Sequence, residues 1–253
     1  MAEPLALVLM APAAVTADGA ATAVEIEGLQ RVALLTVSVT AYTQSAAGSS
    51  VKVYIERRAN TDEAWRSDVV STDEDGVTTV DYLVFTGVGQ QAIGVELGPL
   101  TRLRYDLTNM TTVTLGAAGE MHTVYARPSD LGSVLIAKAI REVTLTERVK
   151  ACINATADAD GRLALAHTLP LTAWGPDLTE KTAQLAVAKA MTIRGADITG
   201  PDSLVYQERD KALSWLNLVA AGRIQPTGLV DSTPEVYQAG AVVVSRPSRW
   251  GCR

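Results

Sequence analysis

The chain has 253 residues, of which 47% are hydrophobic and 20% charged, a balance typical of a soluble globular protein with one large domain or two ordinary ones. Its formal net charge is -6 at pH 7. Nucleic-acid binding depends on a basic face that displaces counterions from phosphate, so we expect no sequence-specific nucleic-acid binding. No apolar run reaches the roughly 18 residues that a membrane span requires, so we expect no membrane partner.

The charge is unevenly distributed along the chain. Residues 1–128 hold 8 Lys and Arg against 15 Asp and Glu, a net charge of -7, whereas residues 129–253 hold 14 against 13, a net charge of +1. This asymmetry predicts two structural units. The two cysteines, Cys152 and Cys252, form no Cys-x-x-Cys pair, which favours a reduced, cytoplasmic setting. The N-terminal apolar run has no Lys or Arg before Arg31, so we do not expect it to be a secretion signal.

The first half of the chain alternates between apolar and polar residues, with turn signals between short runs. The runs that we predict as strands are LALVLM (5–10), VALLTVSVTAY (32–42), SVKVYIER (50–57), DYLVF (81–85), AIGVEL (92–97), RLRYDL (102–107), TTVTL (111–115) and MHTVYA (121–126). Turns are predicted at 46–50, 73–76 and 116–119, where small and polar residues cluster. A period of two with many Val and Thr predicts an all-β sandwich over residues 1–127.

After Arg127-Pro128 the apolar period becomes helical, so we place a domain boundary there. Ser129 is predicted to cap a short first helix, and Thr144-Leu145-Thr146-Glu147 is a capping-box pattern that opens a second. The break at Leu169-Pro170-Leu171 forces the chain out of helical geometry, because proline restricts itself and the residue before it. A third helix is predicted to open at Asp177.

A fourth helix is predicted to open at Pro201-Asp202-Ser203 and to end at Gly222. The residues expected on its inward face are Leu204, Ala212, Trp215, Leu216 and Val219. The fold class is therefore α+β: a sandwich over 1–127, a four-helix domain over 128–225 and an extended C-terminal arm over 226–253.

The chain has few residues of the kinds that catalysis uses. There are two histidines, His122 and His167, and the metalloprotease, nucleophile-elbow and P-loop motifs do not occur. The glycines between Gly87 and Gly94 fit a turn better than a dinucleotide fingerprint. Asp158 and Asp160 resemble the start of a calcium loop, but the later ligands are missing, so a solvent-facing helix end is the better interpretation. We expect no enzyme, no cofactor and no metal.

Three helical segments carry a resemblance to a known family. They are ERVKACINATADADGRLALAHTLPL (147–171), DLTEKTAQLAVAKAMTIRG (177–195) and YQERDKALSWLNLVAAGRI (206–224). The first has an Asp-rich end that leads into Leu169-Pro170-Leu171, and the second is Ala-rich and ends near Arg194. The third opens on Tyr206, carries Trp215-Leu216 in its middle and closes on Ala220 to Gly222. In this order they resemble the head-tail connector (adaptor) family of tailed bacteriophages, over about residues 129–225.

The resemblance implies a structural protein of the virion neck, assembled in the host cytoplasm. Its partners would be itself in a ring, by analogy a dodecamer, then the portal protein, a tail-side neck or stopper protein and the capsid. A rigid helical wedge with a fixed corner would tile into such a ring through complementary side faces. The sandwich is an addition to the family's pattern, and its role does not carry over.

The C-terminal arm would dock on the portal, as tails in this family are thought to do. Three valines would supply strand pairing and apolar contact, a tryptophan would be the buried anchor, and the arginines would meet an acidic surface. The portal-binding residues predicted in this way are Val242, Val243, Val244, Arg246, Arg249, Trp250 and Arg253.

A binding module is the alternative from another functional class. The sandwich would recognise a glycan or a host surface, and the helices would only mount it. Trp65, Tyr54 and Tyr82 are the aromatic residues that such a site would use, although core packing or strand pairing accounts for them at least as well.

Overall fold

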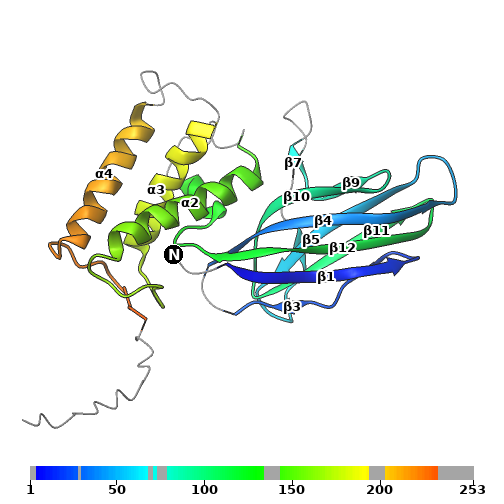
Figure 1. Cartoon of the computed structure of the whole chain (residues 1–253), viewed down its shortest axis with the longest axis horizontal. Coiled ribbons are helices and arrows are strands. Elements are labelled where there is room, and N and C mark those ends of the chain that lie inside the picture. The colour runs from blue at the N-terminus through cyan, green and yellow to red at the C-terminus, as the bar shows by residue number, and fades with distance from the viewer. Residues whose placement is uncertain are drawn as a thin grey trace, which may run out of the picture.

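The computed structural model describes residues 4–27, 30–67, 71–72, 79–133, 143–193 and 203–232. An elongated β part makes up one end of the molecule, and three helices lie together at the other end, with α2 nearest the strands (Figure 1). The site residues predicted in the C-terminal arm, Val242 to Arg253, lie outside the described residues.

The β part consists of two antiparallel sheets. Sheet A has the order β1 (Leu5–Val15), β12 (Met110–Thr123), β4 (Arg31–Gln44) and β10 (Gly89–Glu96). Sheet B has the order β2 (Gly19–Ala20), β11 (Leu100–Thr108), β5 (Ser50–Arg58) and β6 (Arg66–Ser67), with β3 (Val24–Glu25) also on β11 and β9 (Leu83–Phe85) also on β5. A separate pair joins β7 (Ser71–Thr72) to β8 (Thr79–Val80).

Alternate side chains of the two sheets meet in one apolar core. Val37 of β4, Leu103 of β11 and Leu115 of β12 are all fully buried in it. Complete burial of one such side chain stabilises the fold by about 1.5–3 kcal/mol. A one-residue slip of any strand would turn its apolar set outward, so this core also fixes the register.

The turn predicted at 116–119 is wrong, because these residues continue β12 and join two predicted strands into one. The glycines serve close packing instead. A Cβ at Gly119 would lie 2.0 Å from the carbonyl oxygen of Leu34, and one at Gly116 would lie 3.2 Å from Cα of Pro12. Glycine within a strand often marks such a close approach of two backbones.

The predicted four-helix domain is also wrong. The described residues contain three α-helices, α2 (Leu145–Leu163), α3 (Pro176–Ile193) and α4 (Ser203–Ala220), and the chain is rich in sheet. Where the first helix was expected to begin, Pro128–Ser133 forms the short 3-10 helix η1, and the rest of that prediction, over 134–142, lies outside the described residues. The Asp130 carboxylate accepts the backbone N–H of Arg127 at 2.8 Å, a local bond that caps the first turn of η1. Gly132 in the same turn has a low helix propensity.

Other local predictions are confirmed. Thr144 caps α2 in a complete capping box with Glu147. The chain leaves α4 at Gly222, whose φ of 68° lies in the left-handed region that glycine adopts readily. Leu216 is fully buried as expected, but Leu204 is 56% exposed and does not face the other helices.

Small side chains let the three helices approach one another closely. Ala151, Ala155 and Ala159 of α2 are fully buried in the helical core. The same core includes Val32 and Val124 from the β part, so it continues onto the end of sheet A. The domain boundary placed after Arg127-Pro128 stays a prediction.

The corner between α2 and α3 is fixed by the segment that follows α4. The Leu169-Pro170 peptide in this corner is cis. Ala173 forms a β-bridge with Val230, and the Thr227 N–H donates to the Asp177 carboxylate at 2.8 Å. Residues 226–232 therefore run along the corner before the chain continues toward its C-terminus.

Candidate functional site

The helices meet the end of sheet A through a close contact at Gly94 of β10. Its backbone N–H donates to Thr146 Oγ1 at 2.9 Å, at the start of α2. A Cβ at Gly94 would lie only 2.8 Å from Cβ of Val149. The missing side chain thus lets α2 rest directly on the strand. We call this contact region the junction. It includes Gly94 and Thr146, together with two buried polar groups described next, one around Tyr125 and Asp160 and one around Glu96 and Ser129.

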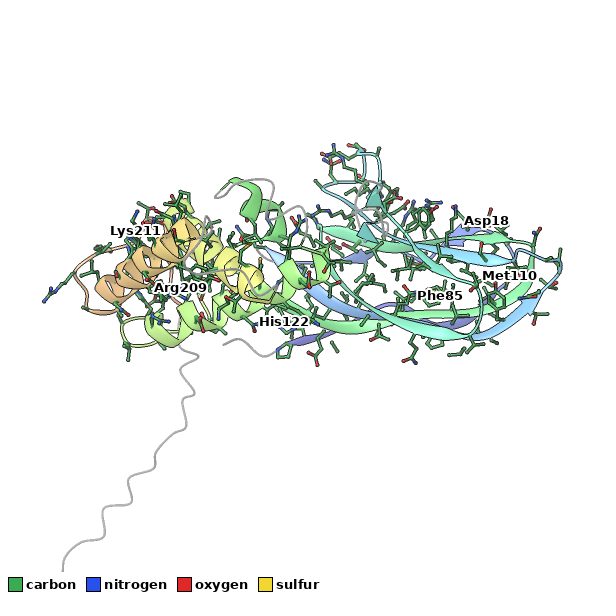
Figure 2. The ribbon with its side chains drawn as sticks, turned by 90° about the horizontal axis from the view of Figure 1, so that it is seen from above. Asp18, Phe85, Met110, His122, Arg209 and Lys211 are labelled. Carbon is green, nitrogen blue, oxygen red and sulfur yellow. The ribbon has the colours of Figure 1, made fainter. Side chains whose placement is uncertain are left out.

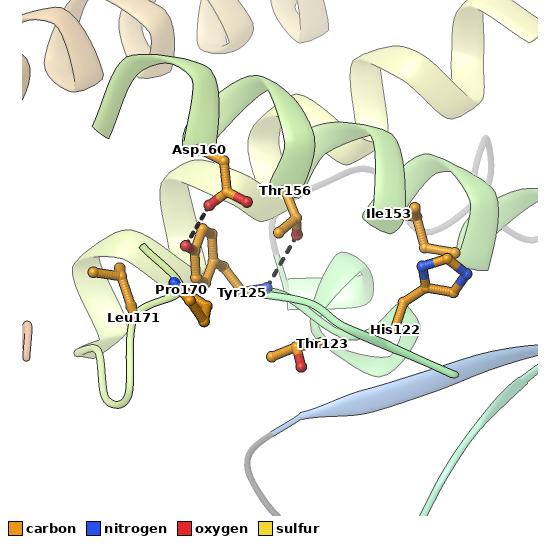
Figure 3. Close-up of a pocket in the computed structure, with 8 residues that line it drawn as sticks. All are labelled: His122, Thr123, Tyr125, Ile153, Thr156, Asp160, Pro170 and Leu171. Carbon is orange, nitrogen blue, oxygen red and sulfur yellow. Dashed lines mark hydrogen bonds between the residues drawn. The ribbon is translucent and has the colours of Figure 1, made fainter. Parts of the chain in front are cut away.

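A buried polar network connects the segment after β12 to α2 (Figure 3). The Tyr125 hydroxyl donates to Asp160 Oδ1 at 2.5 Å, and the Tyr125 N–H donates to Thr156 Oγ1 at 3.1 Å. The ring of Tyr125 packs edge-on against Trp174, with centroids 4.9 Å apart. Burial raises the pKa of Tyr125 well above its ordinary value, and the hydrogen bond to Asp160 raises it further, so the hydroxyl stays a donor.

This network corrects one sequence-based interpretation. Asp160 was expected at a solvent-facing helix end, but it is 5% exposed and accepts the Tyr125 hydroxyl. Its carboxylate therefore holds the helix against the β part, because a buried polar group needs a partner.

A second buried carboxylate, Glu96 at the end of β10, is 4% exposed. Arg57 of sheet B lies 3.0 Å from its Oε1. Ser129 of η1 donates to it twice, from its hydroxyl at 3.0 Å and from its backbone N–H at 3.2 Å. Glu96 therefore joins sheet A, sheet B and η1 at one point, and its charge is paired, as a buried charge requires.

His122 lies where the β part meets the helices, far from Met110 at the opposite end of the sandwich (Figure 2). Its ring points toward Ile153 of α2 and lines a small pocket together with Tyr125 and Asp160 (Figure 3). Burial lowers the pKa of His122, and the nearby Glu120 opposes this only in part. The pocket volume of about 20 Å³ holds a water molecule but no organic substrate.

His167, the other histidine, lies in the corner between α2 and α3. Its Nδ1 is 3.0 Å from Asp231 Oδ1, and the Thr168 N–H donates to the other oxygen of the same carboxylate at 3.2 Å. These contacts fix the segment around Asp231 to the corner between α2 and α3.

The aromatic residues of the alternative hypothesis come together on the outer side of sheet B. Tyr54 and Tyr82 lie with their ring centroids 5.5 Å apart. Trp65 is contacted by two guanidinium groups, Arg102 at 4.0 Å and Arg58 at 4.3 Å from its centroid. We call this surface the arginine–aromatic face. Besides the three aromatic residues it includes the charged residues Lys52, Glu56, Arg58, Arg102, Arg104 and Asp106.

Sequence reasoning missed the junction, although two signals were present. Gly94 is an isolated glycine inside a strand pattern, which often marks a close backbone approach. Glu96 is a charge in an otherwise apolar run, and such a charge is buried only when it is paired. The Tyr125–Asp160 hydrogen bond joins residues 35 positions apart, and no local pattern indicates it.

Over the described part of the chain, no group of three or more His, Cys, Asp and Glu is arranged to hold a metal ion. None of the helices in that part is long and apolar enough to cross a membrane.

Comparisons with known proteins give a weak likeness to solved structures. No protein-family model matches the chain, and no curated protein matches its sequence. Among solved structures, the chain is similar to the SPBc2 prophage-derived protein YomS, with a TM-score of 0.32 and 10% identity, over 48% of this chain and 97% of that one. A likeness with so low a TM-score and identity gives no information about function.

Proposed function

We propose that the protein is a structural component of a tailed-phage particle, an adaptor in the virion neck. Copies of the chain form a ring on the portal and link the capsid to the tail. The partners are other copies, the portal protein and a tail-side neck or stopper protein, with the capsid as a further neighbour. The role is structural, not enzymatic.

The junction is the observation that carries the proposal. A connector has to hold its two ends in a fixed relation, and here α2 is joined to the β part by an apolar core and by buried hydrogen bonds. Gly94 allows direct contact, while Tyr125–Asp160 and Glu96–Ser129 supply directional bonds. Networks of this kind rigidify an arrangement when every group has a partner.

The order of the helices supports the same proposal. The segments that resemble the adaptor family correspond to α2, α3 and α4 with the corner at Leu169-Pro170 between the first two. Asp231 and Ser232 hold the chain at this corner, and the 21 residues 233–253 follow. On the proposal, the residues from Val242 to Arg253 dock on the portal.

Removal of the C-terminal residues tests the docking arm. We expect deletion of residues 236–253 to leave the melting temperature nearly unchanged but to abolish co-sedimentation with portal rings of the same phage. Trp250→Ala is expected to give a large part of this loss, because a buried aromatic anchor dominates many interfaces. Ser248→Ala is the matched control in the same segment and should bind normally. Full portal binding by the truncated chain would refute the docking arm.

A glycan- or host-surface-binding sandwich is the second candidate, favoured by the meeting of Trp65, Tyr54 and Tyr82 on one surface. Sugars stack on open ring faces, whereas Arg104 lies 3.6 Å from the Tyr54 centroid and two guanidiniums contact Trp65. A sugar would have to displace these cations. Specific binding on a glycan array that Trp65→Ala removes would support this candidate over the adaptor.

A further inference from the structure

The arginine–aromatic face is built by the register of β5 and β11. Arg102 lies opposite Glu56, Arg104 opposite Tyr54, and Asp106 opposite Lys52. The alternate positions of the same strands, including Val53, Ile55 and Leu103, are buried in the sandwich core. The charged and aromatic side chains therefore all point to the outer side of sheet B.

One buried carboxylate positions the two central arginines. Glu56 is 6% exposed and accepts Arg102 Nε at 2.9 Å and Arg104 Nε at 2.7 Å. Arg104 also lies 2.6 Å from Asp106. The side chains of Arg102 and Arg104 remain 25% and 30% exposed, so their positions are fixed while part of each guanidinium still faces solvent.

Aromatic rings hold the remaining cations in place. Lys52 Nζ lies 4.6 Å from the centroid of Tyr82, and Arg58 lies over Trp65. Stacking of this kind orders long side chains before any partner arrives, which lowers the entropy cost of binding. The face is thus a pre-organised set of cations.

Its charge is opposite to that of the rest of the molecule. The four cations Lys52, Arg58, Arg102 and Arg104 and the two anions Glu56 and Asp106 sum to +2. Since the whole chain carries -6, the remainder carries -8. Outside this face, a second copy of the chain therefore carries a net charge of the complementary sign.

We propose that the arginine–aromatic face is an interface between copies of this chain, where it binds an acidic surface of a second copy. This inference rests on the proposed ring and names a surface that builds it. Two such faces repel each other, so a two-fold contact through this face is disfavoured. The contact is heterologous, a head-to-tail contact of one face with a different surface, which is the type of contact that closes into rings.

Sedimentation velocity of the purified full chain over a range of concentrations tests the interface. We expect reversible association at about 50 mM salt that weakens strongly at about 500 mM, because ionic screening shortens the range of charge attraction. Lys52→Gln with Arg58→Gln is expected to weaken association about tenfold or more, and it leaves the Glu56 pairs intact.

The matched control is Lys150→Gln with Arg223→Gln, two exposed cations outside this face. It makes the same change in net charge and should associate as the unchanged chain does. Circular dichroism melting of each variant separates loss of association from loss of folding.

Two results would overturn the inference. One is a chain that stays monomeric at every concentration, and the other is association that both double variants weaken equally. Neither result bears on attachment to the portal, which the deletion of residues 236–253 measures separately. Full portal binding by the truncated chain together with normal, face-dependent association would refute the docking arm and leave this interface in place.

Discussion

The Tyr125 hydroxyl joins the segment after β12 to α2 through its hydrogen bond to Asp160. Tyr125→Phe keeps the ring packed on Trp174 but removes the donor to Asp160. We expect a loss of about 1.5–3 kcal/mol in the free energy of unfolding, since the acceptor is charged and buried. Urea denaturation of both proteins measures it.

Tyr42→Phe is the matched control, because the Tyr42 hydroxyl donates to a neutral acceptor, the Ser49 carbonyl, at 2.7 Å. Its expected cost is about 0.5–1.5 kcal/mol. A double-mutant cycle with Asp160→Asn isolates the pair. Equal losses for the two Tyr→Phe variants, with no coupling in the cycle, would contradict the role given to Tyr125.

His122 gives the junction a dependence on pH. Burial lowers the pKa of His122 in the folded state, whereas the unfolded chain has the ordinary value of about 6.5. Below that pH the unfolded chain binds the proton more readily than the folded one, so stability falls as the pH falls. Between pH 8 and pH 5, we expect the wild type to lose more unfolding free energy than His122→Gln, which has no histidine at this position to protonate. A constant difference between the two proteins across this range would exclude the effect.

At the level of single residues, the sequence predicted what local chemistry decides. The Thr144 cap and the end at Gly222 depend on neighbours within one turn, and both are present. Asp160 and Leu204 were placed on the wrong sides of their helices. The burial of a helix face depends on what packs against it. The partner of Asp160, Tyr125, is 35 positions away in the sequence, and Leu204 lies on a part of α4 that is left exposed.

Among the elements, α2 and β10 make the contact on which the junction depends. Gly94→Ala would place a Cβ 2.8 Å from Val149 and 2.9 Å from Cα of Thr146, so α2 must shift. We expect a loss of about 1–3 kcal/mol in the free energy of unfolding, typical of overpacking. Thermal denaturation followed by circular dichroism measures it.

Gly161→Ala is the control within α2 itself. A Cβ at Gly161 meets no atom within 4 Å, and alanine favours a helix over glycine by about 1 kcal/mol. This variant should be as stable as the wild type or more so. If the two alanine variants behave alike, α2 is not seated on β10 through Gly94.

The strands were predicted better than their connections. Alternation identified β1, β4, β5, β10 and β11, because each has one face in the sandwich core. The glycines at 116 and 119 were interpreted as a turn. They lie within β12 instead, where they permit the close approach of the neighbouring strands β1 and β4. The same residue type serves both purposes, and only the neighbouring strand distinguishes them.

For the whole molecule, the change of period near Pro128 indicated where strands give way to helices, but it did not indicate how the two parts join. The helical core includes Val32 and Val124, and Glu96 connects both sheets to η1. These contacts are long-range, so no sequence window contains them. Four helices were predicted after Pro128, whereas the described residues contain three α-helices and the 3-10 helix η1.

The central claim is that copies of this chain form a ring on a portal. A reconstruction of the neck of the phage particle to which the proposal assigns the chain tests it most directly. The account predicts a closed ring of this chain bound to the portal, with residues 242–253 against the portal surface and the arginine–aromatic face against the next copy. A neck without this chain, or single copies placed elsewhere on the particle, would contradict it.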